Sequence, residues 1–127
     1  MNKKTIMKRN KDRAFGIRRL AGKYLELDSF GPDTGYRISP LISREDDKLM
    51  EGYGFYIDFY HGKWSEGSMD SSVCVSVGRD LSGADMVCIS AESFGVVMIP
   101  VSEGFGAVIY SIGEAVMACR TCLRSAA

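Results

Sequence analysis

Apolar and polar residues alternate between residues 53 and 101 with the period of two that is typical of β-strands. This pattern predicts strands in residues 53–64, 72–77, 85–90 and 94–101. In the first segment, positions 55, 57 and 59 are apolar, whereas the even positions carry Tyr56, Asp58 and Tyr60. In the last segment, "FGVVMIPV", nearly every position is apolar, which predicts a strand that is buried on both faces.

Two further strands are expected earlier in the chain. "KYLELDSF" (23–30) alternates with period two, and "YRISPLI" (36–42) follows it after the turn residues "GPDTG". Pro40 cannot donate a backbone hydrogen bond, so this second strand should end there or lie at a sheet edge. "SREDDKLMEG" (43–52) is interpreted as a short helix with Ser43 as its N-cap.

The period changes to 3.6 residues after Ser102, the predicted N-cap of a long helix. Its apolar stripe consists of Phe105, Ile109, Ile112, Val116, Cys119 and Leu123. Gly106 and Gly113 cost helix stability, and they could let the helix axis approach a sheet closely. The predicted fold class is therefore α+β, an antiparallel meander of about four to six strands with a long C-terminal helix packed on one face.

The length of 127 residues and an ordinary balance of apolar and charged residues favour one globular domain, expected to span residues 23–127 after a basic N-terminal arm. The first 20 residues offer no uninterrupted apolar segment of the kind a secretory signal requires. A cytoplasmic location is therefore expected. In that reducing compartment, the four cysteines should be free thiols, a metal site or a redox pair.

The net charge is zero, but its distribution is uneven. Residues 1–30 carry nine Lys or Arg against three acids, whereas residues 31–127 are acidic on balance. We expect residues 1–22 to form a basic arm, with a short helix possible at 11–21. The arm is either a solvated terminus or a nucleic-acid contact. The candidate nucleic-acid-binding residues are Lys3, Lys4, Lys8, Arg9, Arg18 and Arg19.

Cys119 and Cys122 form a C-x-x-C spacing on the predicted helix. They could bind zinc, form a redox pair or fill the core, and burial is the favoured interpretation because a structural zinc site needs four ligands. Cys74 and Cys88 would supply the other two if the hairpin around Leu81 placed them directly opposite each other. A redox role is disfavoured because low-pKa cysteines of this kind lie at helix N-termini, not near the C-terminal end.

Six aromatic residues lie between positions 53 and 64. The polar face of this strand and the loop after it provide the candidate partner-binding residues Tyr56, Asp58, Tyr60 and Trp64, which are expected to be exposed. Aromatic residues of this kind suit protein recognition, and they also suit base stacking, although the carboxylate of Asp58 would repel phosphates.

Two segments resemble the ArdB-type antirestriction proteins. "EGFGAVIYSIGEAVMACRTC" is similar to their C-terminal helix, through Glu103, Gly106, Ile112 and the stretch from Ala118 to Thr121. "LMEGYGFYIDFY" is similar to an upstream segment of the same family. The resemblance covers about a third of the chain. It implies a plasmid- or phage-borne protein that relieves Type I restriction without imitating DNA, which agrees with a net charge of zero.

The sequence therefore predicts a non-enzymatic interaction protein of phage or plasmid origin, without a cofactor or catalytic residues. Its expected partner is a host defence complex, such as restriction enzyme subunits, or a nucleic-acid-processing complex. One alternative is a nucleic-acid-binding regulator that uses the basic arm. The other is a small thiol or zinc-dependent domain that uses Cys119 and Cys122.

Overall fold

The computed structural model describes residues 2–25, 33–43 and 51–126, and it confirms the predicted α+β class. Its sheet contains β1 (Thr34–Ile38), β2 (Ile42–Ser43), β3 (Glu51–His61), β4 (Met69–Arg79), β5 (Asp85–Ala91) and β6 (Gly95–Pro100). The strands are antiparallel in the order β1-β3-β4-β5-β6, and β2 also pairs with β3. The first edge is formed by β1, which stops two residues before Pro40, as the sequence predicts.

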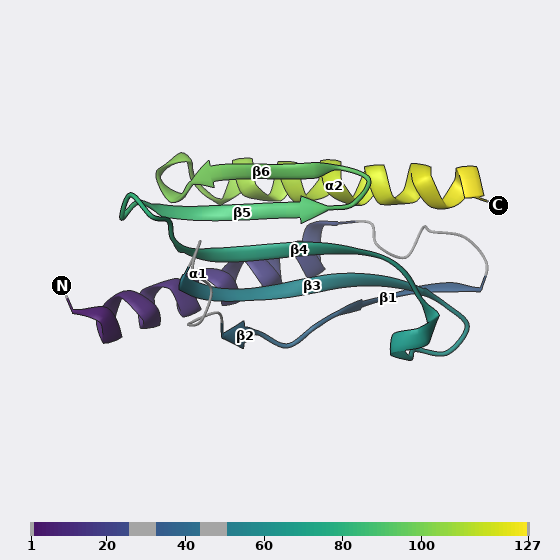
Figure 1. Ribbon diagram of the computed structural model, residues 1–127, viewed down its shortest axis with the longest axis horizontal. Helices are drawn as coiled ribbons and strands as arrows, with labels where there is room; N and C mark the ends of the chain where they lie inside the picture. The colour runs from purple at the N-terminus through teal and green to yellow at the C-terminus, as the bar shows by residue number, and fades with distance from the viewer. Residues whose placement is uncertain (1, 26–32, 44–50, 127) are drawn as a thin grey trace.

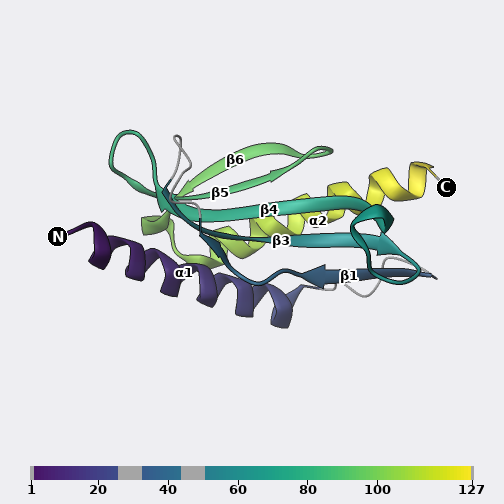
Figure 2. The ribbon, with the colours of Figure 1, turned by 60° about the horizontal axis from the view of Figure 1, so that its bottom comes forward.

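Two long helices, α1 (Lys3–Tyr24) and α2 (Phe105–Ala126), cover the same face of this sheet. Figure 1 looks onto the opposite face, so that the strands lie in front of both helices. The two helices run in the same direction, with α1 over β3 and β4 and α2 over β4 and β5 (Figure 2). We refer to the sheet face away from the helices as the open face.

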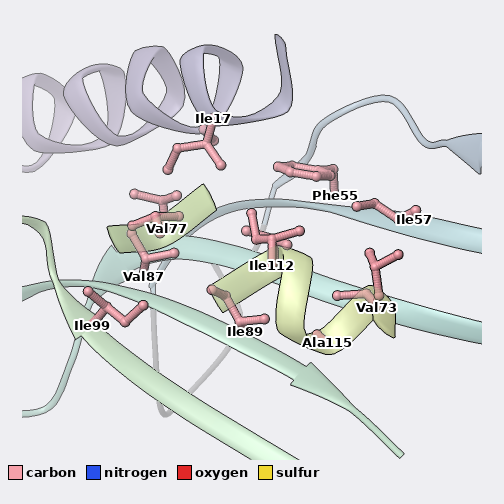
Figure 3. Packing of buried hydrophobic residues seen from close by; sticks show 14 of the residues in the cluster. Ile17, Phe55, Ile57, Val73, Val77, Val87, Ile89, Ile99, Ile112 and Ala115 are labelled. Atoms are coloured by element: carbon pink, nitrogen blue, oxygen red, sulfur yellow. The ribbon is translucent and has the colours of Figure 1, made fainter. Parts of the chain in front are cut away.

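The hydrophobic core fills the space between the helices and the sheet. Ile17 of α1 and Ile112 of α2 point into the same layer as Val77 and Val87 of the sheet (Figure 3). These side chains are fully buried, and each such burial stabilises the fold by about 1.5–3 kcal/mol. The buried cluster is Ala14, Ile17, Phe55, Ile57, Phe59, Val73, Val75, Val77, Val87, Ile89, Ile99, Val108, Ile112, Ala115, Val116 and Cys119.

The basic N-terminal segment differs from the expected arm. A short helix at residues 11–21 is the sequence expectation, whereas α1 spans 22 residues and begins with Asn2 as N-cap, whose side chain accepts a hydrogen bond from the Thr5 N–H. Its buried positions, Met7, Asn10, Ala14, Ile17 and Ala21, recur at steps of three and four. This stripe packs on β3 and β4, and α1 is therefore part of the core.

The prediction that the last strand is buried on both faces is wrong. In β6, Ile99 is buried on the helix-covered side, but Val96 and Met98 on the other side are 69% and 43% exposed. Among the described strands, β6 lies at the second edge of the sheet and pairs only with β5. An apolar run therefore indicates a strand here, but not two covered faces.

The β4–β5 hairpin forms two residues away from the expected register. Cys88 lies opposite Ser76, and Cys74 lies opposite Ser90, so the two cysteines are not direct partners. The Asp80 carboxylate accepts hydrogen bonds from the backbone N–H groups of Ser82 and Ala84, and this turn sets the register.

The start of α2 also differs from the prediction. Ser102 lies in a 3-10 turn, η3 (Val101–Glu103), and Gly104 follows it with φ of 89°, so the helix itself begins at Phe105. Nor do the two helix glycines bring α2 to the sheet. A Cβ at Gly106 would meet open space, and one at Gly113 would touch Leu25 at 3.6 Å.

The predicted strand at 23–30 and the predicted helix at 43–52 lie largely outside the described residues. Within the described part of the chain, no helix has the length and apolar composition that would be needed to cross a membrane.

Candidate functional site

A pocket of about 550 Å³ opens on the open face, at the end of the sheet where β1, β3 and β4 meet the β3–β4 loop. Its walls are largely apolar, with charged and hydroxyl groups among them, as is common in ligand and peptide sites. The lining residues are Arg37, Ser39, Pro40, Ile42, Tyr56, Asp58, Trp64, Glu66, Met69 and Ser72. We call this the open-face pocket.

Strand register brings the polar residues of this pocket together. Asp58 on β3 lies directly between Arg37 of β1 and Ser72 of β4, so the three side chains share one face. The Ser72 hydroxyl donates a hydrogen bond of 2.8 Å to Asp58 Oδ1. Asp58 is only 6% exposed, which differs from the expectation of an exposed residue. A carboxylate in this position favours a ligand that offers it a hydrogen-bond donor.

Arg37 and two aromatic residues contact one another beside this carboxylate. The Arg37 guanidinium carbon lies 4.7 Å from the centre of the Trp64 ring, and the Trp64 ring meets Tyr60 edge-on at 5.3 Å between centroids. Tyr60 in turn covers Gly35, where a Cβ would lie 2.7 Å from the tyrosine ring. A larger residue at this position would require the Tyr60 ring to shift, so Gly35 allows Tyr60 to lie where it contacts Trp64 from the side.

The β3–β4 loop holds Trp64 in place by local hydrogen bonds. Gly62, with φ of 65°, makes the turn after β3, and its N–H donates to the Asp33 carbonyl. After Trp64, the Ser65 N–H donates to the Ser68 hydroxyl oxygen, which also lies 3.0 Å from the Lys63 carbonyl oxygen. The short 3-10 helix η2 (Glu66–Ser68) then leads into β4. The indole is therefore presented by a folded turn.

The other wall of the pocket depends on how β1 ends. Ser39 is buried, and its hydroxyl oxygen accepts the Tyr56 N–H at 2.9 Å while its own N–H donates to the Tyr56 carbonyl. Arg18 of α1 donates to the carbonyl oxygens of Ile38 and Ser39 at 3.1 and 2.8 Å. The end of β1 is thus tied to both α1 and β3 beside the pocket.

Three of the four predicted partner-binding residues, Tyr56, Asp58 and Trp64, line the open-face pocket. The fourth, Tyr60, packs against Trp64 from outside it. Sequence reasoning missed Arg37, whose guanidinium group makes no ion pair with any residue that the structure describes. The alternation in "YRISP" indicates that Arg37 lies on one face of a strand. The sequence does not show that this face adjoins Asp58, because β3 lies about 20 residues further along the chain.

The predicted nucleic-acid-binding residues separate into two groups on α1. Arg9 and Arg18 have internal roles, because Arg9 pairs with Asp85 at 2.7 Å and Arg18 holds the end of β1. Lys3, Lys4, Lys8 and Arg19 are exposed. The predicted set is thus not one surface, because two of its members are committed to packing.

Asp85 on β5 forms the main electrostatic link between α1 and the sheet. Arg9 and Arg13 both contact its Oδ2 atom, at 2.7 and 2.9 Å, and Arg79 lies 3.7 Å from Oδ1. Burial by itself would raise the pKa of Asp85. The hydrogen bond from Arg13 and the charges of Arg9, Arg13 and Arg79 outweigh that effect, and the pKa lies below its usual range.

The cysteines do not converge among the side chains that the structure describes. Cys119 is buried in the core between α2 and the sheet, where the Ser93 hydroxyl lies 3.8 Å from its sulfur. Cys74 and Cys88 lie on the open face, on the other side of the sheet, and the side chain of Cys122 lies outside the described set. No group of three or more His, Cys, Asp and Glu residues in the described segments has metal-binding geometry.

These features define an α+β protein with one helix-covered sheet face and one face that carries a pocket of mixed charge. Comparison of the chain with protein-family models, with curated proteins and with solved structures finds no match. The resemblance to the ArdB-type family therefore stays a prediction from the residues that carry it.

Proposed function

We propose that this chain is a non-enzymatic interaction protein, of phage or plasmid origin, that binds a subunit of a host restriction-type complex through the open-face pocket. One observation carries the proposal. The residues that the sequence singles out for partner binding lie in or beside a single pocket, next to an arginine without an acidic partner among the described residues.

The composition of the site supports a protein partner. Tryptophan, tyrosine and arginine are the residue types that contribute most to the affinity of protein–protein interfaces. Here Trp64 already contacts Arg37 and Tyr60 and is held by a folded turn, so binding would cost little side-chain entropy. Pre-organisation of this kind favours recognition of a partner segment.

The pocket also indicates what that segment should contain. The apolar side chains of Ile42, Trp64 and Met69 would receive an apolar or aromatic residue of the partner. A guanidinium that stacks on an indole keeps its in-plane N–H groups available, so Arg37 would bind a carboxylate. Asp58 would accept a hydrogen bond from a donor beside it. The expected partner segment therefore combines an apolar anchor with an adjacent acidic residue.

The resemblance to antirestriction proteins indicates which host complex to test first. A protein that inhibits restriction by imitating DNA would need a dense anionic surface, whereas this chain has zero net charge and an exposed lysine-bearing helix. Direct binding to a restriction subunit is the mechanism that fits these features.

The test uses Trp64→Ala in the full chain, with Tyr110→Ala as the matched control. Tyr110 is an aromatic residue of α2 that is 70% exposed and lies outside the pocket. In bacteria with a Type I restriction system, the wild-type chain should raise the plating efficiency of unmodified phage. Trp64→Ala should abolish this effect, and Tyr110→Ala should retain it.

A pull-down from the same cells, with and without nuclease, examines binding directly. Restriction subunits should be recovered by the wild type and by Tyr110→Ala regardless of nuclease, and lost with Trp64→Ala or Arg37→Glu. The proposal is refuted if phage restriction is unchanged by the wild-type chain, or if the pocket variants and the control behave alike while all of them remain folded.

A further inference from the structure

A second pocket, of about 890 Å³, lies between the first three turns of α1 and the start of β3. It is lined by Lys3, Lys4, Thr5, Met7, Lys8, Lys11 and Tyr53. Four of these seven residues are lysines and none is acidic. We call this the lysine pocket, and it shares no lining residue with the open-face pocket.

Helix geometry explains why these lysines gather. Positions 4, 8 and 11 recur at steps of four and three, which places them on one side of a helix. At a rise of about 1.5 Å per residue, the three side chains begin over a length of about 10 Å along the axis. Lys11 Nζ lies 5.8 Å from the centre of the Tyr53 ring, so an aromatic ring borders the same row of charges.

The basic residues of α1 have divided roles. Arg9, Arg13 and Arg18 are held by Asp85 or by the end of β1. In contrast, Lys4 and Lys8 form no ion pair or hydrogen bond with any residue that the structure describes, and they are exposed. The first turn of α1 adds the positive end of the helix dipole to this side of the molecule. Arg9, Arg13 and Arg18 thus hold the fold together, whereas Lys4 and Lys8 are available to a ligand.

We propose that the lysine pocket binds successive phosphates of a nucleic-acid strand without reading its sequence. Lysine ammonium groups act as point charges that suit phosphates. The lining of this pocket has no arginine, asparagine or glutamine, whose planar groups make many of the bidentate contacts that read base edges. A row of lysines about 10 Å long matches a repeating anion better than a single one. Tyr53, partly buried at the border of the row, would add an aromatic contact for a base. This site goes beyond the proposed protein-binding function and is independent of it.

The experiment is fluorescence anisotropy of the full chain with a labelled 20-nucleotide oligo-dT, titrated at several salt concentrations. Contact of about three phosphates should give a slope of about −2 for log K against log salt, because each contact on a single strand contributes about −0.7. The variant Lys4→Gln, Lys8→Gln, Lys11→Gln should bind at least tenfold more weakly at low salt, with a slope near zero. The corresponding triple arginine variant should retain binding.

The matched control carries Arg19→Gln, Lys23→Gln and Lys63→Gln, three exposed charges outside the lysine pocket. It has the same net charge as the lysine variant and should retain most of the affinity. Equal losses in both variants would mean diffuse attraction rather than a site, and they would overturn the proposal. Absence of binding at 25 mM salt would do the same.

Two further measurements identify the ligand. Inorganic triphosphate that competes with the oligonucleotide at equal concentration of phosphate would indicate a site for a free polyphosphate and would overturn the nucleic-acid proposal. Weak competition supports it. Trp64→Ala should bind the oligonucleotide as well as the wild type does, so failure at the open-face pocket and failure at the lysine pocket can be told apart.

Discussion

The contact between Asp85 and the arginines of α1 provides a quantitative test of how the N-terminal helix is held. The change Asp85→Asn preserves the shape of the side chain and removes its charge. It removes the negative charge that Arg9 and Arg13 share and leaves three guanidinium groups around a neutral amide with a single acceptor oxygen. We expect the free energy of unfolding to fall, because the cations then repel one another without compensation.

The magnitude follows from the exposure of the groups. A hydrogen bond to a charged group contributes about 1.5–3 kcal/mol when it is buried, and an exposed ion pair about 0.2–1 kcal/mol. The side chains of Asp85, Arg9 and Arg13 are 18%, 34% and 24% exposed, which places the two contacts between these limits. We expect a loss of about 2 kcal/mol, or a decrease in Tm of about 8 °C for a domain of this size.

Urea denaturation at several pH values is the assay. A carboxyl group whose pKa is lowered by folding adds stability above its unfolded pKa, and this contribution is lost as the pH falls through the folded value. In the folded protein, Arg13, Arg9 and Arg79 hold the pKa of Asp85 below the ordinary aspartate pKa of about 3.9. The difference between wild type and Asp85→Asn should therefore be constant from pH 7 to about pH 5 and should shrink below about pH 4.

The control is Glu92→Gln, which removes an exposed carboxylate in the β5–β6 turn and should change stability by less than about 0.5 kcal/mol. The reasoning is refuted if Asp85→Asn costs no more than this control at pH 7. It is also refuted if the difference stays undiminished as the wild-type carboxyl group becomes protonated.

Four other substitutions examine the core, the sheet and its edge, each by urea denaturation at pH 7. Gly52→Ala should cost more than about 2 kcal/mol or prevent folding, because the new Cβ would lie 1.9 Å from the Val77 carbonyl oxygen, and a stable variant would contradict the strand spacing. Gly113→Ala should stabilise α2 by up to about 1 kcal/mol, since the added methyl group meets only an ordinary contact; a loss would argue against that packing. Ile112→Ala should cost about 2–4 kcal/mol through loss of a fully buried side chain, and a neutral effect would place Ile112 outside the core. Val96→Thr should change stability by less than about 0.5 kcal/mol, whereas a large loss would mean that β6 is covered after all.

Much of the secondary structure is visible in the periodicity of side chains. The faces of β3 are assigned correctly from the alternation at positions 55–60, because a strand directs successive side chains to opposite sides whatever it packs against. The apolar stripe of α2 is predicted through Ile112, Val116 and Cys119 for the corresponding reason, its period of 3.6. The length of α1 is underestimated, because lysines and arginines separate the positions that face the sheet and one of those positions is the polar Asn10.

Features that depend on the pairing of distant segments were not predictable in the same way. The hairpin register that separates Cys74 from Cys88 depends on hydrogen bonds made by Asp80 within the turn. The exposure of Val96 depends on the position of β6 at the sheet edge. Neither the hairpin register nor the exposure of Val96 can be predicted from the residues of the strand itself.

The two candidate sites show the same division. The sequence by itself determined that Tyr56 and Asp58 share one face of β3 and that the N-terminal segment is basic, and it predicted a recognition role for Tyr56, Asp58 and Trp64. Only the tertiary structure placed Arg37 beside Asp58, and only it separated the arginines that hold α1 from the lysines that line a pocket. The physical reason is that side-chain periodicity is a property of the local backbone. The partner of a charge, by contrast, is decided by which distant strands and helices pack together.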